Sequence, residues 1–438
     1  MSTSAARPIT RASVTAAGVA LFLSFMDVAA LLPTVAPHVR GLGASATGVG
    51  LAVGAYSATN LPANIIGGIL IDRIGRRRVT ILGFLLAAVA VLGYALATTV
   101  GGFIAIRAAH GVAGGILVTA VFAVAGDRTR AGRAGRSFGR FGALIGAAWV
   151  IGPAVAGAVR QAAGTDVVFQ MIAVLLLIGA VVSALFIHDV VRDEADDPTS
   201  GDDAVGEDVS RGRAMRELAA RPAVRRALVA TMAWLAAVGI LAAFLPETAE
   251  ALGAPASAVG GLFTAYAVMA GLLMLSPLSG RVDRNGADSM IALGLAVIAL
   301  SLVAMIVARD LTTLMLASAL FGTGYGLIFP AVTGAISLAA TTRTRGRAFG
   351  LFNAAFSAGL ALGAPIAGGL ADTVAQVSGG IDSLDPFVPA AVLCLAASAW
   401  ILSAARRPCG RERRAELTRR AAPRGTAGRA TAEGLRDR

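Results

Sequence analysis

Long apolar stretches alternate with short polar ones along most of the chain. Each apolar stretch is close to the roughly 20 residues that a helix needs to cross the hydrocarbon core of a bilayer. Six stretches precede a long polar segment and six follow it: 12–36, 46–71, 78–99, 101–125, 137–160 and 166–188, then 225–247, 255–280, 288–308, 311–338, 347–371 and 386–405. The pattern predicts an all-α integral membrane protein with twelve transmembrane helices.

The polar segment between the two sets divides the chain into halves of similar length. It carries nine acidic residues from Asp189 to Asp208, followed by basic residues from Arg211. Such a low-hydrophobicity, charged segment is typical of a solvated linker. We therefore expect an N-terminal tail, a six-helix bundle, a linker, a second six-helix bundle and a basic, disordered tail, at 1–11, 12–188, 189–224, 225–405 and 406–438.

The two halves repeat each other at one fixed spacing. Asp72, in the segment Gly-Ile-Leu-Ile-Asp-Arg-Ile-Gly, has a counterpart in Asp283, and Arg136, in Arg-Ser-Phe-Gly-Arg-Phe, has a counterpart in Arg347. Both pairs are 211 residues apart. A shared offset in two separate segments indicates duplicated halves, and in transporters built this way the substrate binds near the membrane midplane where the halves meet.

Composition supports a membrane protein and excludes several other classes. The chain is 56% hydrophobic and 15% charged, whereas soluble domains have about 25% charged residues. The net charge of +12 comes from arginine in short blocks between apolar stretches, which indicates membrane topology and no nucleic-acid partner. Two cysteines and three histidines fit neither a disulfide framework nor a metal site.

Arginine also predicts the orientation in the membrane. With the N-terminus inside, the short loops and the N-terminal tail place 16 arginines on the inner side and 3 on the outer side. An arginine excess marks cytoplasmic loops. We therefore expect both termini in the cytoplasm and the protein in the cell membrane.

A charged, glycine-containing segment joins the second and third predicted spans. Its glycines allow the chain to turn tightly, and Asp72 is placed to meet a helix N-terminus or an arginine of the other bundle. Either this segment latches one conformation or it is only a positively charged cytoplasmic loop. The latch hypothesis, which we favour, rests on Gly68, Asp72, Arg73, Gly75, Arg76 and Arg77.

Two predicted spans contain ionisable residues at membrane depth. Asp27 is the single acidic residue well inside a span, and Arg107 and His110 share one face of the fourth span. Charges at this depth are costly and mark functional sites. We expect Asp27 to bind a proton or a cationic substrate; the alternative is a buried ion pair with Arg107 that only positions helices. His110 either titrates or only donates and accepts hydrogen bonds.

The fifth span contains Gly152 and Pro153, followed by Gly157. Proline removes a backbone hydrogen bond and permits a kink, and glycine lets a neighbouring helix approach. Six further residues could line a substrate cavity, although such residues more often serve packing: Tyr56, Asn60, Trp234, Tyr266, Asn353 and Phe356.

Together these motifs resemble the major facilitator superfamily. The loop segment is similar to its signature G-x-L-a-D-r-x-G-r-k-x-x-l and departs from it at Thr80. The segment from Arg107 to Gly111 resembles the fourth-span motif R-x-x-q-G, with His110 in place of the usual glutamine. The Gly152-Pro153 segment resembles the antiporter motif g-x-x-x-G-P-x-x-G-G, with Ala148 and Ala156 at two of its glycine positions.

The resemblance implies two six-helix bundles that rock around a central cavity, and a drug/proton antiporter. Its expected role is export of a small lipophilic drug or metabolite, driven by the proton gradient without a cofactor, by a monomer that is not an enzyme. The same scaffold would also serve an exporter or importer of a sugar, a lipid or another metabolite. A non-transporting receptor or scaffold remains the alternative from another class, although it would not need Asp27 or Arg107 at membrane depth.

Overall fold

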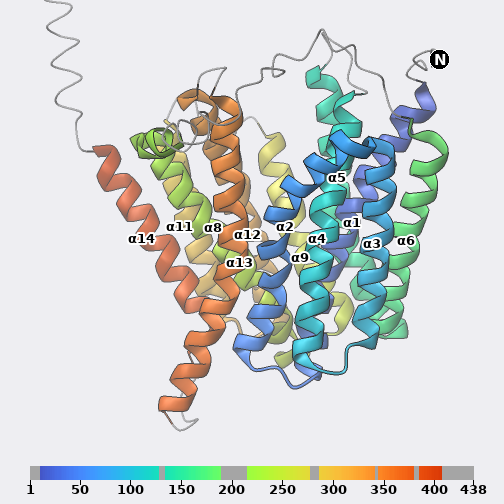
Figure 1. The fold of residues 1–438 in the computed structure, drawn as a ribbon. Helices are drawn as coiled ribbons and strands as arrows, with labels where there is room; N and C mark the ends of the chain where they lie inside the picture. The colour runs from blue at the N-terminus through green and yellow to red at the C-terminus, as the bar shows by residue number, and fades with distance from the viewer. Residues whose placement is uncertain are drawn as a thin grey trace, which may run out of the picture.

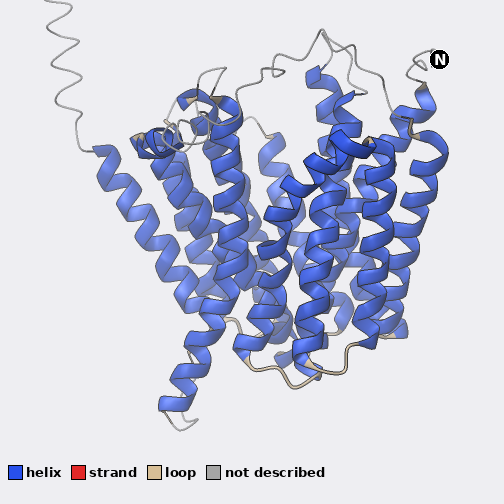
Figure 2. Cartoon of the chain, viewed as in Figure 1, coloured by secondary structure: helices blue, strands red, loops and turns tan. Residues whose placement is uncertain are grey.

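The chain forms a bundle of long helices. The computed structural model describes residues 10–127, 134–188, 215–276, 286–340, 344–378 and 384–406, and this part of the chain contains no strand (Figure 2). Its twelve long helices are α1 (Arg11–Gly41), α2 (Ala46–Ile74), α3 (Arg76–Leu96), α4 (Val100–Asp127), α5 (Ala134–Ala163), α6 (Thr165–Phe186), α8 (Pro222–Ala251), α9 (Ala256–Leu275), α11 (Ala287–Val307), α12 (Leu311–Ala339), α13 (Arg345–Val377) and α14 (Phe387–Arg406). The predicted all-α membrane fold is confirmed.

Most helix ends lie within about one turn of the ends of the predicted apolar stretches, on either side of them: α2 continues past its stretch to Ile74, whereas α3 ends at Leu96, before its stretch does. The largest difference is in α13, which continues to Val377 although its apolar stretch ends at residue 371. The additional residues include Asp372 and Thr373, which hydropathy alone excludes from a span but which continue the helix. The N-terminal tail before residue 10, most of the linker and the basic tail lie outside the described residues.

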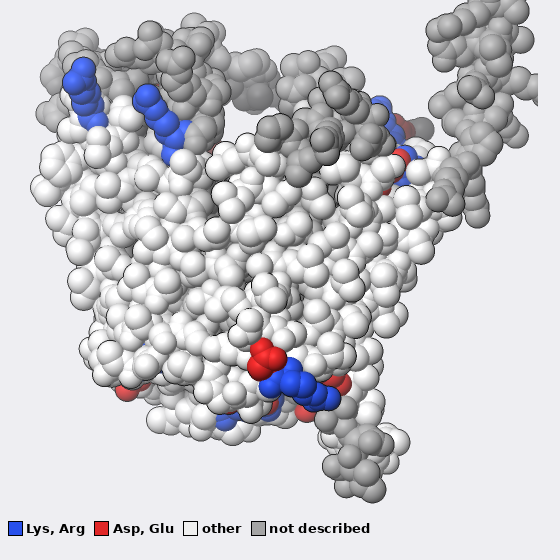
Figure 3. Space-filling model, turned by 180° about the vertical axis from the view of Figure 1, so that it is seen from behind, with Lys and Arg blue, Asp and Glu red and all other residues white. Residues whose placement is uncertain are grey.

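Eleven of the described helices are long and apolar enough to cross a membrane. The remaining one, α2, carries Asn60, Pro62 and Asn64 along its length. It packs against α4 and α13, and its Asn60 and Asn64 side chains are hydrogen-bonded to α4. In the space-filling view, charged side chains of the described residues gather at the two ends of the molecule and an uncharged band separates them (Figure 3). That band is the surface expected of a protein surrounded by lipid.

Two six-helix halves, α1–α6 and α8–α14, stand side by side (Figure 1). The start of α1 and the end of α14 lie at the same end of the bundle, which we call the N-side; the opposite end is the far side. The halves meet chiefly through α2 with α13 and α5 with α9. Gly75 and Gly286, which are 211 residues apart, both have positive φ, +86° and +80°, in equivalent turns. The repeat in the sequence is therefore also a repeat in the backbone.

Glycines on α3 and α4 allow helices of the first half to approach closely. A Cβ atom on Gly83 would lie 2.8 Å from the Cα atom of Leu117. On α4, a Cβ atom on Gly111 would meet the backbone carbonyl of Tyr56 on α2. Membrane helices associate through such small-residue contacts because lipid offers no hydrophobic driving force between them.

Replacing Gly83 with leucine is expected to destabilise the first half. The new side chain has no space beside the α4 backbone, and overpacking of this kind costs about 1–3 kcal/mol. Thermal unfolding of the purified protein measures the effect. Gly146→Leu is the matched control, because no atom lies within 4 Å of a Cβ built there; an equal loss in both variants would contradict the packing argument.

Candidate functional site

The buried ionisable residues of the first half form one hydrogen-bonded network. Asp27 on α1 is 2% exposed and His110 on α4 is 0% exposed. The Oδ2 atom of Asp27 lies 2.9 Å from the Nε2 atom of His110. On its other side, the Nδ1 atom of His110 lies 2.8 Å from the hydroxyl oxygen of Tyr94 on α3. Three helices are thus joined through polar atoms inside an apolar bundle.

Arg107 forms the other end of this network. Its Nη1 atom donates a hydrogen bond of 3.1 Å to the Tyr94 hydroxyl oxygen. Since Tyr94 accepts from Arg107, its own proton is free to point to His110 Nδ1, and His110 then donates from Nε2 to the Asp27 carboxylate. In this order of donors, Tyr94 and His110 connect the Arg107 guanidinium to the Asp27 carboxylate.

The structure corrects one sequence-based alternative. A direct buried ion pair between Asp27 and Arg107 is the sequence-based alternative, but the described partner of the Asp27 carboxylate is His110, at 2.9 Å. Arg107 reaches the carboxylate only through Tyr94 and His110. Its guanidinium instead faces aromatic rings, with the central carbon 4.9 Å from the ring centre of Tyr56 and 5.9 Å from that of Tyr94, distances at which cation–π attraction operates.

Two polar atoms of the network have no hydrogen-bond partner among the described residues. They are the second carboxylate oxygen of Asp27, Oδ1, and the Nε atom of Arg107, both buried. A buried polar atom without a partner costs about 1–3 kcal/mol, so natural structures rarely keep one without a use. Oδ1 of Asp27 is thus a buried acceptor without a described donor.

Helix packing fixes this network in place. Tyr56 on α2 contacts the His110 ring with 5.2 Å between ring centres, and it reaches that position because Gly111 and Gly114 leave room for it on α4. Asn60, one turn further along α2, donates from Nδ2 to the Gly111 carbonyl at 3.4 Å. The polar residues that α2 carries are therefore part of the surroundings of the network.

The Gly-Pro segment of α5 lies between α1 and α9. A Cβ atom on Gly152 would lie 2.9 Å from the Cβ atom of Ala29, close to Asp27 on α1. The Pro153 carbonyl contacts Gly260 of α9, and Gly157 also packs against Gly260. These three residues of α5 therefore link the helix that carries Asp27 to the second half of the protein.

The charged loop segment lies at the N-side, between α2 and α3. Gly75, with φ of +86°, ends α2 and begins α3. Arg76 forms an ion pair of 2.7 Å with Asp127 at the end of α4, and Arg77 donates to the Ala184 carbonyl of α6 at 2.5 Å. Asp72 and Arg73 are exposed, whereas Gly68 is half-buried. The described contacts of this segment thus lie within the first half.

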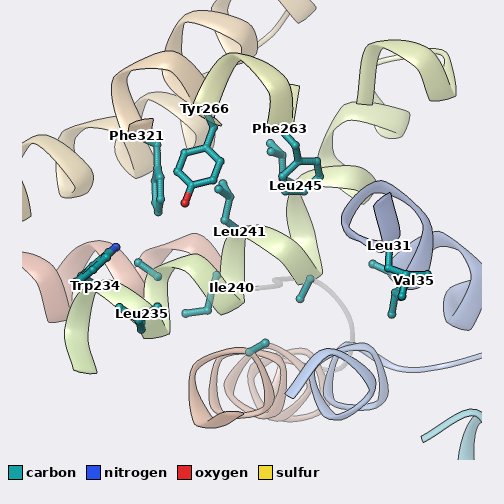
Figure 4. Close-up of a cluster of buried hydrophobic side chains, with 14 of the residues drawn as sticks. Leu31, Val35, Trp234, Leu235, Ile240, Leu241, Leu245, Phe263, Tyr266 and Phe321 are labelled. Carbon is teal, nitrogen blue, oxygen red and sulfur yellow. The ribbon is translucent and has the colours of Figure 1, made fainter. Parts of the chain in front are cut away.

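The remaining cavity candidates fall mainly in an aromatic cluster of the second half. Trp234 on α8 is 0% exposed, and its ring centre lies 4.8 Å from that of Tyr325 on α12 and 6.4 Å from that of Phe356 on α13. Tyr266 on α9 lies above this group beside Phe321 (Figure 4). Asn353, by contrast, is exposed.

Sequence reasoning missed Tyr94, the residue that connects His110 to Arg107. A single tyrosine in an apolar span is as often a packing residue or an interfacial anchor, so its identity alone carried no signal. The sequence did contain a signal for Tyr94. Only four tyrosines occur in the chain, and Tyr94 lies near the same membrane depth as Arg107 on the neighbouring span.

Comparisons with known proteins agree with this fold. The chain spans less than half the length of the curated relatives it matches. It is 23% identical over 169 residues to the quinolone resistance protein NorA of Staphylococcus aureus (strain MRSA252), which covers 39% of this chain and 43% of that protein. It is 26% identical over 169 residues to multidrug resistance protein 2 of Bacillus subtilis (strain 168), with 39% and 42% covered.

Solved transporter structures share the fold over nearly the whole chain. A mutant of the nucleoside transporter NupG superposes with a TM-score of 0.75 at 13% identity, covering 90% of this chain and 99% of that one. A bacterial homologue of the human lysosomal transporter Spinster, in an inward-facing and unoccupied conformation, gives 0.74 at 14% identity, with 91% and 98% covered. The model of the Major Facilitator Superfamily matches residues 17–247 and 227–431, and the chain therefore belongs to this superfamily of membrane transporters.

Proposed function

We propose that this transporter exports small lipophilic molecules, drugs or metabolites, in exchange for protons. The observation that carries the proposal is the Asp27 carboxylate, buried at membrane depth with one oxygen bonded to His110 and the other without a partner. A carboxyl group that takes up and releases a proton within the membrane is what coupling to a proton gradient requires. Asp27 is the proton-binding residue of this proposal, with His110 and Arg107 as its partners.

Exchange of substrate for a proton follows if both bind to the ionised carboxylate of Asp27 and exclude each other. A proton that enters from the outside binds at Oδ1 and neutralises the carboxylate, which weakens the hold on a substrate bound nearby and lets it leave outward. After the halves reverse, the proton leaves toward the cytoplasm and the carboxylate is again available to substrate. His110, Tyr94 and Arg107 keep the ionised carboxylate balanced by a positive charge during that step.

Two further observations support export by a protein with its termini in the cytoplasm. Arginine dominates the short loops of the N-side, which is the mark of a cytoplasmic face. The relatives that match the chain are named for quinolone and multidrug resistance, and the aromatic cluster around Trp234 suits a lipophilic substrate. The loop segment with Asp72 and Arg76 would then lie in the cytoplasm and latch the state in which the N-side is closed.

Transport assays test the coupling role of Asp27. Proteoliposomes with an imposed pH gradient are supplied with a fluorescent quinolone, the compound class in the name of the staphylococcal relative. We expect Asp27→Asn to lose accumulation driven by the gradient, because the amide cannot carry the proton and, like the protonated carboxyl group, holds the substrate weakly. Gradient-driven accumulation at the wild-type rate in this variant would refute the assignment.

Asp310→Asn is the matched control. Asp310 is exposed and caps α12 by accepting from the Thr313 backbone nitrogen at 2.8 Å, a role that asparagine fills equally well. It removes one carboxylate from the same protein without touching the network. Transport by this variant should match the wild type, and a loss equal to that of Asp27→Asn would show that the assay reports only damage to the fold.

Tyr94→Phe tests the network itself. Removing the hydroxyl leaves His110 Nδ1 and Arg107 Nη1 without the atom that they share, which is expected to lower the free energy of unfolding by about 1–3 kcal/mol. Chemical unfolding in detergent measures it. Ser318→Ala also deletes one buried hydroxyl, but this one has no described partner, so its removal should not lower the free energy of unfolding; an equal loss in both variants would mean that Tyr94 contributes only packing.

A further inference from the structure

The two halves of the protein are joined on the far side by side chains that cap helices of the opposite half. Gln161, in the last turn of α5, accepts a hydrogen bond at Oε1 from the Ser257 backbone nitrogen at the start of α9, at 3.1 Å. Asp372, near the end of α13, accepts from the backbone nitrogens of Ala46 and Thr47 at the start of α2, at 3.2 and 2.8 Å. Each contact crosses between the halves.

These two contacts are equivalent under the internal repeat. Gln161 and Asp372 are 211 residues apart, and so are Ala46 and Ser257. That spacing is the offset of the internal repeat, so the side chains and the helix ends that they cap occupy equivalent positions. The repeat has thus produced a pair of reciprocal caps, one from each half onto the other.

Close packing accompanies both caps. Gly157 lies one turn before Gln161, and Gly368 one turn before Asp372, again at the repeat offset. Gly157 contacts the Ala256 carbonyl at the start of α9, and Gly368 contacts the Ala46 carbonyl at the start of α2. The absent side chains let each helix end come within hydrogen-bonding distance of the side chain that caps it.

The two caps differ in charge. Asp372 carries a carboxylate, which also accepts from the Thr47 hydroxyl at 2.6 Å, and a negative charge at a helix N-terminus is favoured by the helix dipole. Hydrogen bonds to charged groups contribute about twice as much as neutral ones. Gln161 is neutral and makes one such bond. The cap on α2 is therefore the stronger of the two.

Other contacts between the halves on the far side are weaker candidates for holding the halves together. Arg40 and Glu247 form an ion pair of 2.6 Å whose side chains are 35% and 49% exposed, and exposed pairs contribute about 0–1 kcal/mol. Arg160 pairs with Glu250, which is also exposed at 38%. Neither pair satisfies a helix end, whereas α2 and α9 would lose the partners of their first backbone N–H groups if the caps broke.

We propose that Asp372 and Gln161 are the gate residues that hold the far side of this transporter closed, and that Asp372 contributes most. Opening the far side separates α2 from α13 and α5 from α9, which requires both caps to break together. The proposal concerns the opening equilibrium alone. It therefore holds or fails independently of proton coupling and of the identity of the substrate.

Distances between spin labels measure that equilibrium directly. Labels are attached to cysteines at Gly41 and Gln376, which are exposed on the far side of the first and second halves, after Cys394 and Cys409 are changed to serine. The protein is reconstituted in nanodiscs without substrate or gradient. We expect Asp372→Ala to raise the ratio of the longer-distance to the shorter-distance population about 10-fold or more, and Gln161→Ala to raise it about 2- to 10-fold.

Control variants separate a gate from a general loss of structure. Thr373→Ala alters the neighbouring residue, whose hydroxyl bonds within α13 to the Gly369 carbonyl at 2.7 Å, and should leave the distances unchanged. If Asp372→Ala does not fold, Asp372→Asn and Thr47→Val should shift the populations in the same direction by less. Unchanged distances in the double variant Asp372→Ala/Gln161→Ala, or in both milder variants where it does not fold, would overturn the proposal.

Discussion

The hydrogen bond between Asp27 and His110 is the interaction on which the organisation of the first half depends. A carboxylate inside a membrane bundle is tolerated only when its charge is balanced. Here the positive charge of Arg107, one helical turn before His110, balances the carboxylate, and the Tyr94 hydroxyl on α3 is hydrogen-bonded to both Arg107 and His110. Helices α1, α3 and α4 are consequently held in one arrangement, and α2 closes over it through the glycines of α4.

The two halves share a fold but differ in the chemistry at their centres. The first half contains the buried Asp27, Arg107 and His110, whereas the second half has at its centre the aromatic cluster around Trp234 and Tyr266. The repeat thus supplies a symmetric framework on which one half is suited to handle charge and the other to contact apolar surface. The packing of α5 against α9 and of α13 against α2 joins the half with the charged network to the half with the aromatic cluster.

Much of the fold could be predicted because hydropathy directly reports what lipid requires of a helix. All twelve helices, the repeat and the depth of Asp27 follow from the sequence in this way. The hydrogen-bond partners of a buried side chain do not follow from the sequence, because the spacing of residues along one helix does not say which neighbouring helix each residue faces. Tyr94 and the cap from Asp372 to α2 depend on helix packing between segments 16 and 326 residues apart, and only the structure brings them together.

Infrared difference spectroscopy of the purified protein tests the central claim, that substrate and proton compete at Asp27. In a preparation that is protonated before substrate is added, the account predicts that substrate removes the absorption of one protonated carboxyl group and that the change is absent in Asp27→Asn. An unchanged carboxyl absorption on substrate binding, or the same loss in Asp27→Asn, would contradict it.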